Sequence, residues 1–77
     1  MQLNIKYYGL LVEATNCNTE VIDFSKSSIS ELLDVLFEQH PNLIGKDFQI
    51  AQNQEIVSQN TLVSEGEIAL LPPFAGG

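Results

Sequence analysis

The sequence predicts an α+β fold in which one main helix packs across one face of a mixed β-sheet. Three observations predict it. Short apolar segments typical of strands lie on both sides of a single amphipathic helix, turn residues separate these segments, and a last apolar run stops at Pro72-Pro73. With 77 residues, of which 44% are hydrophobic, the chain is long enough for one domain with one core.

The first two strands are expected at residues 2–8 and 19–24. In the first segment Leu3, Ile5 and Tyr7 alternate with more polar residues, and this period of two indicates a half-buried strand. Gly9 begins the connection, and the small and polar residues 14–18 predict a loop. The two strands are therefore expected to pair as a hairpin.

The main helix is expected at residues 29–40. Ser28 and Glu31 have the spacing of a capping box, in which each side chain satisfies a free backbone N–H group at the start of a helix. Pro41 stops the helix. One apolar stripe predicts the face that meets the core, and it consists of Ile29, Leu32, Leu33, Leu36 and Phe37.

Three further strands are expected after the helix, at residues 48–52, 55–57 and 68–71. Asn53-Gln54 predicts a tight turn between the first two, and residues 64–67 predict a turn before the last. The resulting order, β, β, α, β, short β, β, is the β-grasp or ubiquitin-like arrangement. Residues 1–71 are expected to form this domain, and residues 72–77 to leave it as an extended C-terminal arm.

The side chains of the last strand point alternately to the two faces of the sheet. We assign Ile68 and Leu70 to the core, which places Ala69 and Leu71 on the open face beside the arm. Exposed apolar residues there would form a docking patch. The alternative interpretation is that they are ordinary scattered surface hydrophobes.

The arm, residues 72–77, has the composition of a narrow, stiff probe. Pro72 and Pro73 donate no backbone hydrogen bond and favour an extended chain. At roughly 3.3 Å per residue, the arm reaches on the order of 20 Å. Gly76 and Gly77 lack Cβ atoms, so the end of the arm fits a narrow channel. Activation of the Gly77 α-carboxylate by ATP would prepare it for a sulfur or nitrogen nucleophile; a frayed terminus is the alternative.

Composition argues against several classes of partner and site. The net charge of −7 disfavours nucleic acid and anionic membrane surfaces, and favours a basic protein surface. The first residues lack the features of a secretion signal, and a single cysteine fits a reducing compartment, so a cytoplasmic protein is expected. Cys17 is interpreted as an incidental loop cysteine, because no histidine or lysine lies near it in the sequence to activate its thiol. His40 is interpreted as a structural residue at the end of the helix, and one histidine with one cysteine cannot make a metal site.

Four stretches of the chain resemble the MoaD/ThiS sulfur-carrier family. They are Tyr7-Tyr8-Gly9 followed by Glu13, residues 50–54, residues 64–68, and the arm Pro72-Pro73-Phe74-Ala75-Gly76-Gly77. The resemblance covers nearly the whole chain. Pro-Pro ahead of Gly-Gly is similar to the molybdopterin synthase branch. Val12 departs from the basic residue that the family often has before the position of Glu13.

The resemblance implies that a MoeB-like enzyme adenylates Gly77 with ATP and that sulfur then converts it to a thiocarboxylate. It also implies that the arm enters a MoaE-like large subunit, in a heterotetramer, and donates sulfur to cyclic pyranopterin monophosphate. The chain would bind no cofactor and turn over no substrate alone. Phe74 is the expected anchor in the partner. A carrier of another pathway (thiamine-type), a ubiquitin-like protein modifier and a pure binding module are the alternatives.

Overall fold

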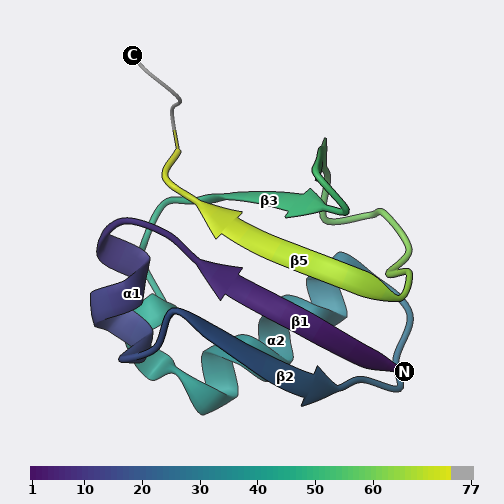
Figure 1. Ribbon diagram of the computed structural model, residues 1–77, viewed down its shortest axis with the longest axis horizontal. Coiled ribbons are helices and arrows are strands. Elements are labelled where there is room, and N and C mark those ends of the chain that lie inside the picture. The colour runs from purple at the N-terminus through teal and green to yellow at the C-terminus, as the bar shows by residue number, and fades with distance from the viewer. Residues whose placement is uncertain (74–77) are drawn as a thin grey trace.

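The computed structural model describes residues 1–73, whose strands form one five-stranded mixed sheet (Figure 1). The order across the sheet is β2-β1-β5-β3-β4. β1 and β5 are parallel, and the other neighbouring pairs are antiparallel. This confirms the predicted α+β, β-grasp arrangement. The strands are β1 (Gln2–Tyr7), β2 (Thr19–Asp23), β3 (Gln49–Gln52), β4 (Glu55–Val57) and β5 (Gly66–Leu71).

Helix α2 (Ile29–Gln39) covers one face of this sheet, behind it in Figure 1. The helix begins with the predicted capping box: Ser28 Oγ accepts from the Glu31 N–H at 3.3 Å, and Glu31 Oε1 accepts from the Ser28 N–H at 3.0 Å. Its apolar stripe packs on the alternate residues of the central strands. The fully buried members of this core include Leu3, Ile5, Ile29, Leu32, Leu36, Leu43, Ile68 and Leu70.

Ser28→Ala is expected to lower the free energy of unfolding by about 1 kcal/mol, because it leaves the Glu31 N–H without its capping acceptor. For a domain of this size, the melting temperature should fall by about 4–8 °C. Ser30→Ala is the matched control, since Ser30 is exposed and is not the capping residue. Chemical denaturation of both variants checks this, and equal losses would contradict the role of the cap.

The connection after β1 differs from the prediction, because residues expected as loop belong to a short helix, α1 (Leu10–Thr15). Leu11 and Thr15, four residues apart, are buried on its inner side. Thr15 Oγ1 donates to the Leu11 carbonyl at 3.0 Å, and Asn16 ends the helix in a left-handed conformation. The apolar residues 10–12 form the first turn of this helix, and the small and polar residues that follow them form its end rather than a loop. A second addition is the 3₁₀ helix η1 (Pro41–Leu43).

The start of β5 is anchored by Asn53 in the β3–β4 turn. As predicted, Asn53-Gln54 forms that turn, and both residues have positive φ. The backbone N–H of Asn53 donates to the Glu67 carbonyl at 2.8 Å, and its side-chain oxygen accepts from the Glu67 N–H at 2.9 Å. These bonds set where β5 begins, and so where it ends and releases the arm.

Within residues 1–73, no helix is both long and apolar enough to cross a membrane.

Candidate functional site

The arm leaves the domain from the end of the central strand. Leu71, the last residue of β5, is half-buried opposite Gln49 of β3. On the other side, the Tyr8 N–H donates to the Leu70 carbonyl at 3.2 Å, which extends the pairing with β1 to the end of the strand. Pro72 and Pro73 are exposed and follow outside the sheet, as predicted. The origin of the arm is therefore held from two sides.

Gly9 lets the chain approach the first residue of the arm. Its φ is +61°, in the left-handed region, and a Cβ added to it would lie 3.2 Å from Pro72 Cγ. The turn after β1 thus packs closely under Pro72. Any larger residue in place of Gly9 would press on the base of the arm.

An apolar surface surrounds the point where the arm leaves the domain. We call it the arm-base patch. Tyr8 is 43% exposed, Leu10 is 74% exposed and Ile44 is 63% exposed. Tyr8 and Leu10 line one hollow with Pro72 and Pro73, and Leu10 lines a second with Ile44. The patch consists of Tyr8, Leu10, Ile44, Pro72 and Pro73, and Lys46 lines both hollows. Large apolar side chains gathered on a surface are typical of a protein-binding site.

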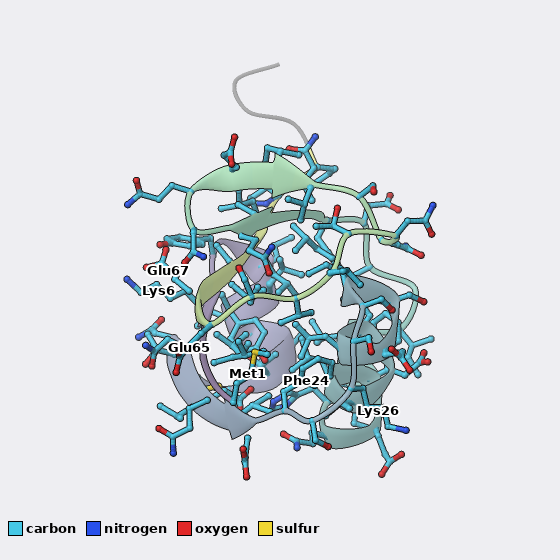
Figure 2. The ribbon with its side chains drawn as sticks, turned by 90° about the vertical axis from the view of Figure 1, so that its right-hand side faces the viewer. Met1, Lys6, Phe24, Lys26, Glu65 and Glu67 are labelled. Carbon is cyan, nitrogen blue, oxygen red and sulfur yellow. The ribbon has the colours of Figure 1, made fainter. Side chains whose placement is uncertain are left out.

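The prediction that Ala69 is exposed on the open face of the sheet is wrong. Ala69 does point to that face, beside Lys6 of β1 and Ala51 of β3, but it is only 6% exposed. The methyl group of Ala69 lies in the middle strand, between β1 and β3, where a short side chain has little exposed surface. Lys6 Nζ lies 3.2 Å from Glu67 Oε1 on the side of the sheet away from α2 (Figure 2). Of the two residues assigned to this face, only Leu71 offers appreciable surface.

The predicted site residues are therefore placed as follows. Ile68 and Leu70 are in the core as expected, and Leu71, Pro72 and Pro73 lie at the base of the arm. Phe74, Ala75, Gly76 and Gly77 lie outside the described residues. Their roles as anchor, spacer and reactive end stay predictions.

A second cluster was missed by sequence reasoning. Glu20 Oε2 accepts a hydrogen bond from the Tyr7 hydroxyl at 2.5 Å and lies 2.6 Å from His40 Nε2. The Tyr7 and His40 rings meet edge to face, with centroids 5.8 Å apart. Cys17 lies beside them. Burial, and then the Glu20 carboxylate, raise the pKa of the Tyr7 hydroxyl well above its ordinary value, so Tyr7 keeps its proton and remains a donor.

This raised pKa makes stability depend on pH in alkaline solution. Above pH 10.0, the ordinary value for tyrosine, the unfolded chain loses the Tyr7 proton and the folded chain retains it. The free energy of unfolding should therefore fall as pH rises, by up to about 1.4 kcal/mol per pH unit. Tyr7→Phe should flatten this fall, whereas Tyr8→Phe should keep it. Denaturation in urea between about pH 9 and about pH 11 checks this, and equal slopes for wild type and Tyr7→Phe would contradict it.

Comparison with solved structures gives close matches over the whole chain. A putative molybdopterin converting factor subunit 1 from Pyrococcus furiosus has a TM-score of 0.89 at 17% identity, covering 96% of this chain and 99% of that one. SAMP1 from Haloferax volcanii has a TM-score of 0.84 at 24% identity, with full coverage of both chains. A complex of subunits 1 and 2 of the molybdopterin-converting factor from Helicobacter pylori matches at 27% identity, with a TM-score of 0.69 and full coverage of both chains.

Comparison with protein families gives a match to the ThiS family over residues 5–77. The match begins at residue 5, within β1, and includes the rest of the β-grasp domain and the arm with its two glycines. It agrees with the resemblance seen in the sequence. The chain belongs to the ThiS family, and is a ubiquitin-like sulfur carrier of the ThiS/MoaD type.

Proposed function

We propose that this chain is the sulfur-carrier subunit of a molybdopterin synthase. The observation that carries the proposal is the exit of Pro72-Pro73 from the central strand, beside an apolar patch, with Gly76-Gly77 beyond it. The Helicobacter pylori neighbour is a complex of subunits 1 and 2 of a molybdopterin-converting factor, which supports a large-subunit partner here. This partner would resemble MoaE, and a MoeB-like enzyme would activate the arm.

The chemistry takes place at the α-carboxyl group of Gly77. A carboxylate oxygen attacks the α-phosphorus of ATP on the activating enzyme, and pyrophosphate leaves. Hydrosulfide from the sulfur donor then attacks the acyl carbon and displaces AMP, which leaves a thiocarboxylate. Inside the large subunit, this sulfur displaces an oxygen substituent of cyclic pyranopterin monophosphate. Water then hydrolyses the acyl–sulfur bond, which leaves the sulfur on the pterin and regenerates the Gly77 carboxylate. A tethered nucleophile gains effective concentration, and enclosure protects it from water.

The experiment that tests the carrier chemistry is intact-mass measurement of the purified chain after incubation with ATP, a sulfur donor and the host's activating enzyme. We expect a gain equal to the replacement of one oxygen by sulfur, located on Gly77. No gain, with the enzyme shown active on another carrier, would overturn the proposal. Adding a large subunit and cyclic pyranopterin monophosphate to the sulfur-loaded chain should yield molybdopterin; no transfer would instead favour a thiamine-type or other sulfur pathway.

A protein modifier is the second candidate function. One solved structure that matches this chain is SAMP1 from Haloferax volcanii, and a second matching structure is that of small archaeal modifier protein 1 from the same organism. These matches favour a modifier as the alternative. In that case, the activated Gly77 would acylate lysine side chains of other proteins. Adducts that resist denaturation, and that appear in lysate only when the activating enzyme is present, would support it.

The arm-base patch is expected to bind the large subunit. Leu10→Lys should weaken this binding at least about tenfold, because it places a charge in an apolar contact. Leu62→Lys is a matched control: Leu62 is 69% exposed against 74% for Leu10, and it precedes the opposite end of β5. Titration calorimetry of both variants with the large subunit checks this. Equal affinities would place the interface elsewhere.

A further inference from the structure

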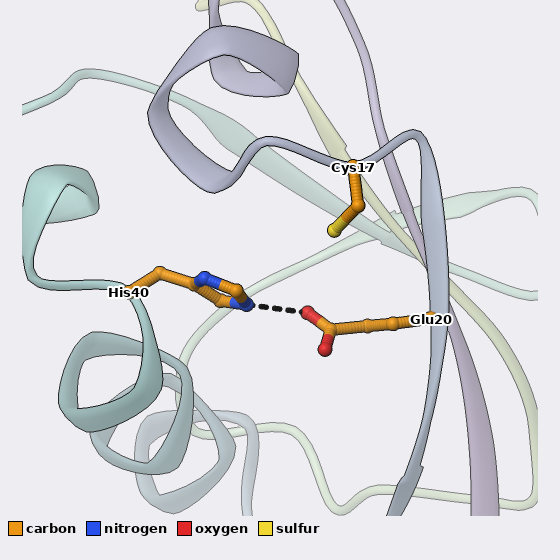
Figure 3. A group of neighbouring side chains, drawn as sticks. All are labelled: Cys17, Glu20 and His40. Atoms are coloured by element: carbon orange, nitrogen blue, oxygen red, sulfur yellow. Dashed lines mark hydrogen bonds and ion pairs between the residues drawn. The ribbon is translucent and has the colours of Figure 1, made fainter.

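Three side chains of types that can ligate a metal lie close together, away from the arm-base patch. Cys17 lies in the connection between α1 and β2, Glu20 on β2, and His40 at the C-terminal end of α2 (Figure 3). One ligand atom from each, the sulfur, a carboxylate oxygen and a ring nitrogen, lie within 4.8 Å of one another. All three residues are half-buried, so water and a small ion have access.

The surrounding structure holds these side chains in place. The Tyr7 hydroxyl donates to Glu20 Oε2 at 2.5 Å and the Tyr7 ring packs against the His40 ring, so Tyr7 orients two of the three. Cys17 is held through its backbone, since the Cys17 N–H donates to Thr15 Oγ1 at 3.4 Å. Partners that orient ligands in this way raise metal affinity.

The set of donors suits Zn²⁺. Zinc takes thiolate sulfur at about 2.3 Å, imidazole nitrogen at about 2.0–2.1 Å and carboxylate oxygen at about 2.0–2.2 Å, usually in a tetrahedron. A tetrahedron with these bond lengths separates the ligand atoms by roughly 3.2–3.8 Å. The 2.6 Å contact between His40 Nε2 and Glu20 Oε2 would therefore open by less than about 1 Å to admit the ion. Small rotations of the three side chains accomplish this.

We propose that Cys17, Glu20 and His40 form a zinc site with three protein ligands and a fourth position for water. The ion replaces the hydrogen bond between Glu20 and His40, and the Cys17 thiol releases its proton on binding. Tyr7 continues to donate to the ligating carboxylate. The site links β2, the end of α2 and the α1–β2 connection, so binding stabilises the folded domain. It is independent of the chemistry at Gly77.

Cobalt(II) is the probe for this site, added to the untagged full chain with its Gly77 carboxylate unmodified and its thiol reduced. We expect one Co²⁺ per chain, intense visible bands of tetrahedral cobalt, a sulfur-to-cobalt charge-transfer band in the near ultraviolet, and displacement by Zn²⁺. Zn²⁺ should also raise the melting temperature. Absence of the charge-transfer band would overturn the proposal.

Variants separate this site from adventitious binding. Cys17→Ser should abolish the charge-transfer band, and Cys17→Ser and Glu20→Gln should each weaken Zn²⁺ binding at least about tenfold. Glu38→Gln removes the same charge as Glu20→Gln from an exposed position on α2 and should bind like wild type. If Glu20→Gln does not fold, the Cys17→Ser variant alone tests the proposal, because replacing one sulfur by oxygen is a small change to the structure. Zinc affinity unchanged in Cys17→Ser would mean an adventitious ion only, and would overturn the proposal.

Discussion

A chain that lacks Gly77 is expected to fold like wild type and to form no detectable thiocarboxylate. The hydrogen bonds that define the sheet and α2 all lie within residues 1–73, so the deletion leaves the described domain unchanged. The remaining carboxylate, on Gly76, would stop about 3.5 Å short of the position of the original one. Misplacement of a reacting group by about 1 Å already costs on the order of 100-fold in rate, so the loss should be at least that large.

Intact mass after reaction with ATP, sulfur donor and activating enzyme measures this loss, and the melting temperature confirms the fold. Gly77→Ala keeps the length of the arm and adds one methyl group. It therefore distinguishes the effect of arm length from the effect of side-chain size in the channel of the activating enzyme. If the channel of the activating enzyme is narrow, Gly77→Ala should also fail. Wild-type thiocarboxylate formation by the shortened chain would refute the assignment of the reactive group to Gly77.

Gly66→Ala is expected to destabilise the fold by on the order of 3 kcal/mol, from backbone strain and a lost hydrogen bond. The φ of Gly66 is +133°, which L-residues rarely adopt, and an added Cβ would lie 2.2 Å from Asn53 Oδ1. That oxygen accepts from the Glu67 N–H, so Asn53 cannot move away without losing a hydrogen bond at the start of β5. The melting temperature should fall by about 15 °C.

Gly45→Ala is the matched control. Gly45 also has positive φ, +88°, but within residues 1–73 a Cβ there would meet no atom within 4 Å other than those of its chain neighbours. It should show only the strain, about 1 kcal/mol. Chemical denaturation of the two variants measures the difference. If both lose the same free energy, the contact with Asn53 is not what requires glycine at residue 66.

Local signals explain why most of the fold could be predicted from the sequence. The capping box at Ser28 and the apolar stripe of α2 each depend on residues within a few positions of one another. The turn at Asn53-Gln54 and the alternation in β1 are local in the same way. α1 was missed because it has only six residues and no side-chain cap at Gly9.

The properties that depend on distant residues could not be predicted. The shielding of Ala69 follows from its neighbours in the sheet, which are Lys6 and Ala51. The cluster of Cys17, Glu20 and His40 requires the end of α2 to meet β2, and no spacing in the sequence indicates this. The prediction of a reactive end at Gly77 depends on the amino-acid composition of the arm alone. Residues 74–77 lie beyond the part of the chain that the structure describes.

The order of the strands has a consequence for synthesis of the chain. Of the five strands within residues 1–73, β5 leaves the ribosome last, and it takes the middle of the sheet, between β1 and β3. Until it emerges, the β1–β2 hairpin and the β3–β4 hairpin have no strand to join them. Incomplete chains therefore cannot assemble the sheet, and their unpaired strand edges expose them to proteases and chaperones. The surface that presents the arm is thus completed only in chains whose synthesis has passed β5.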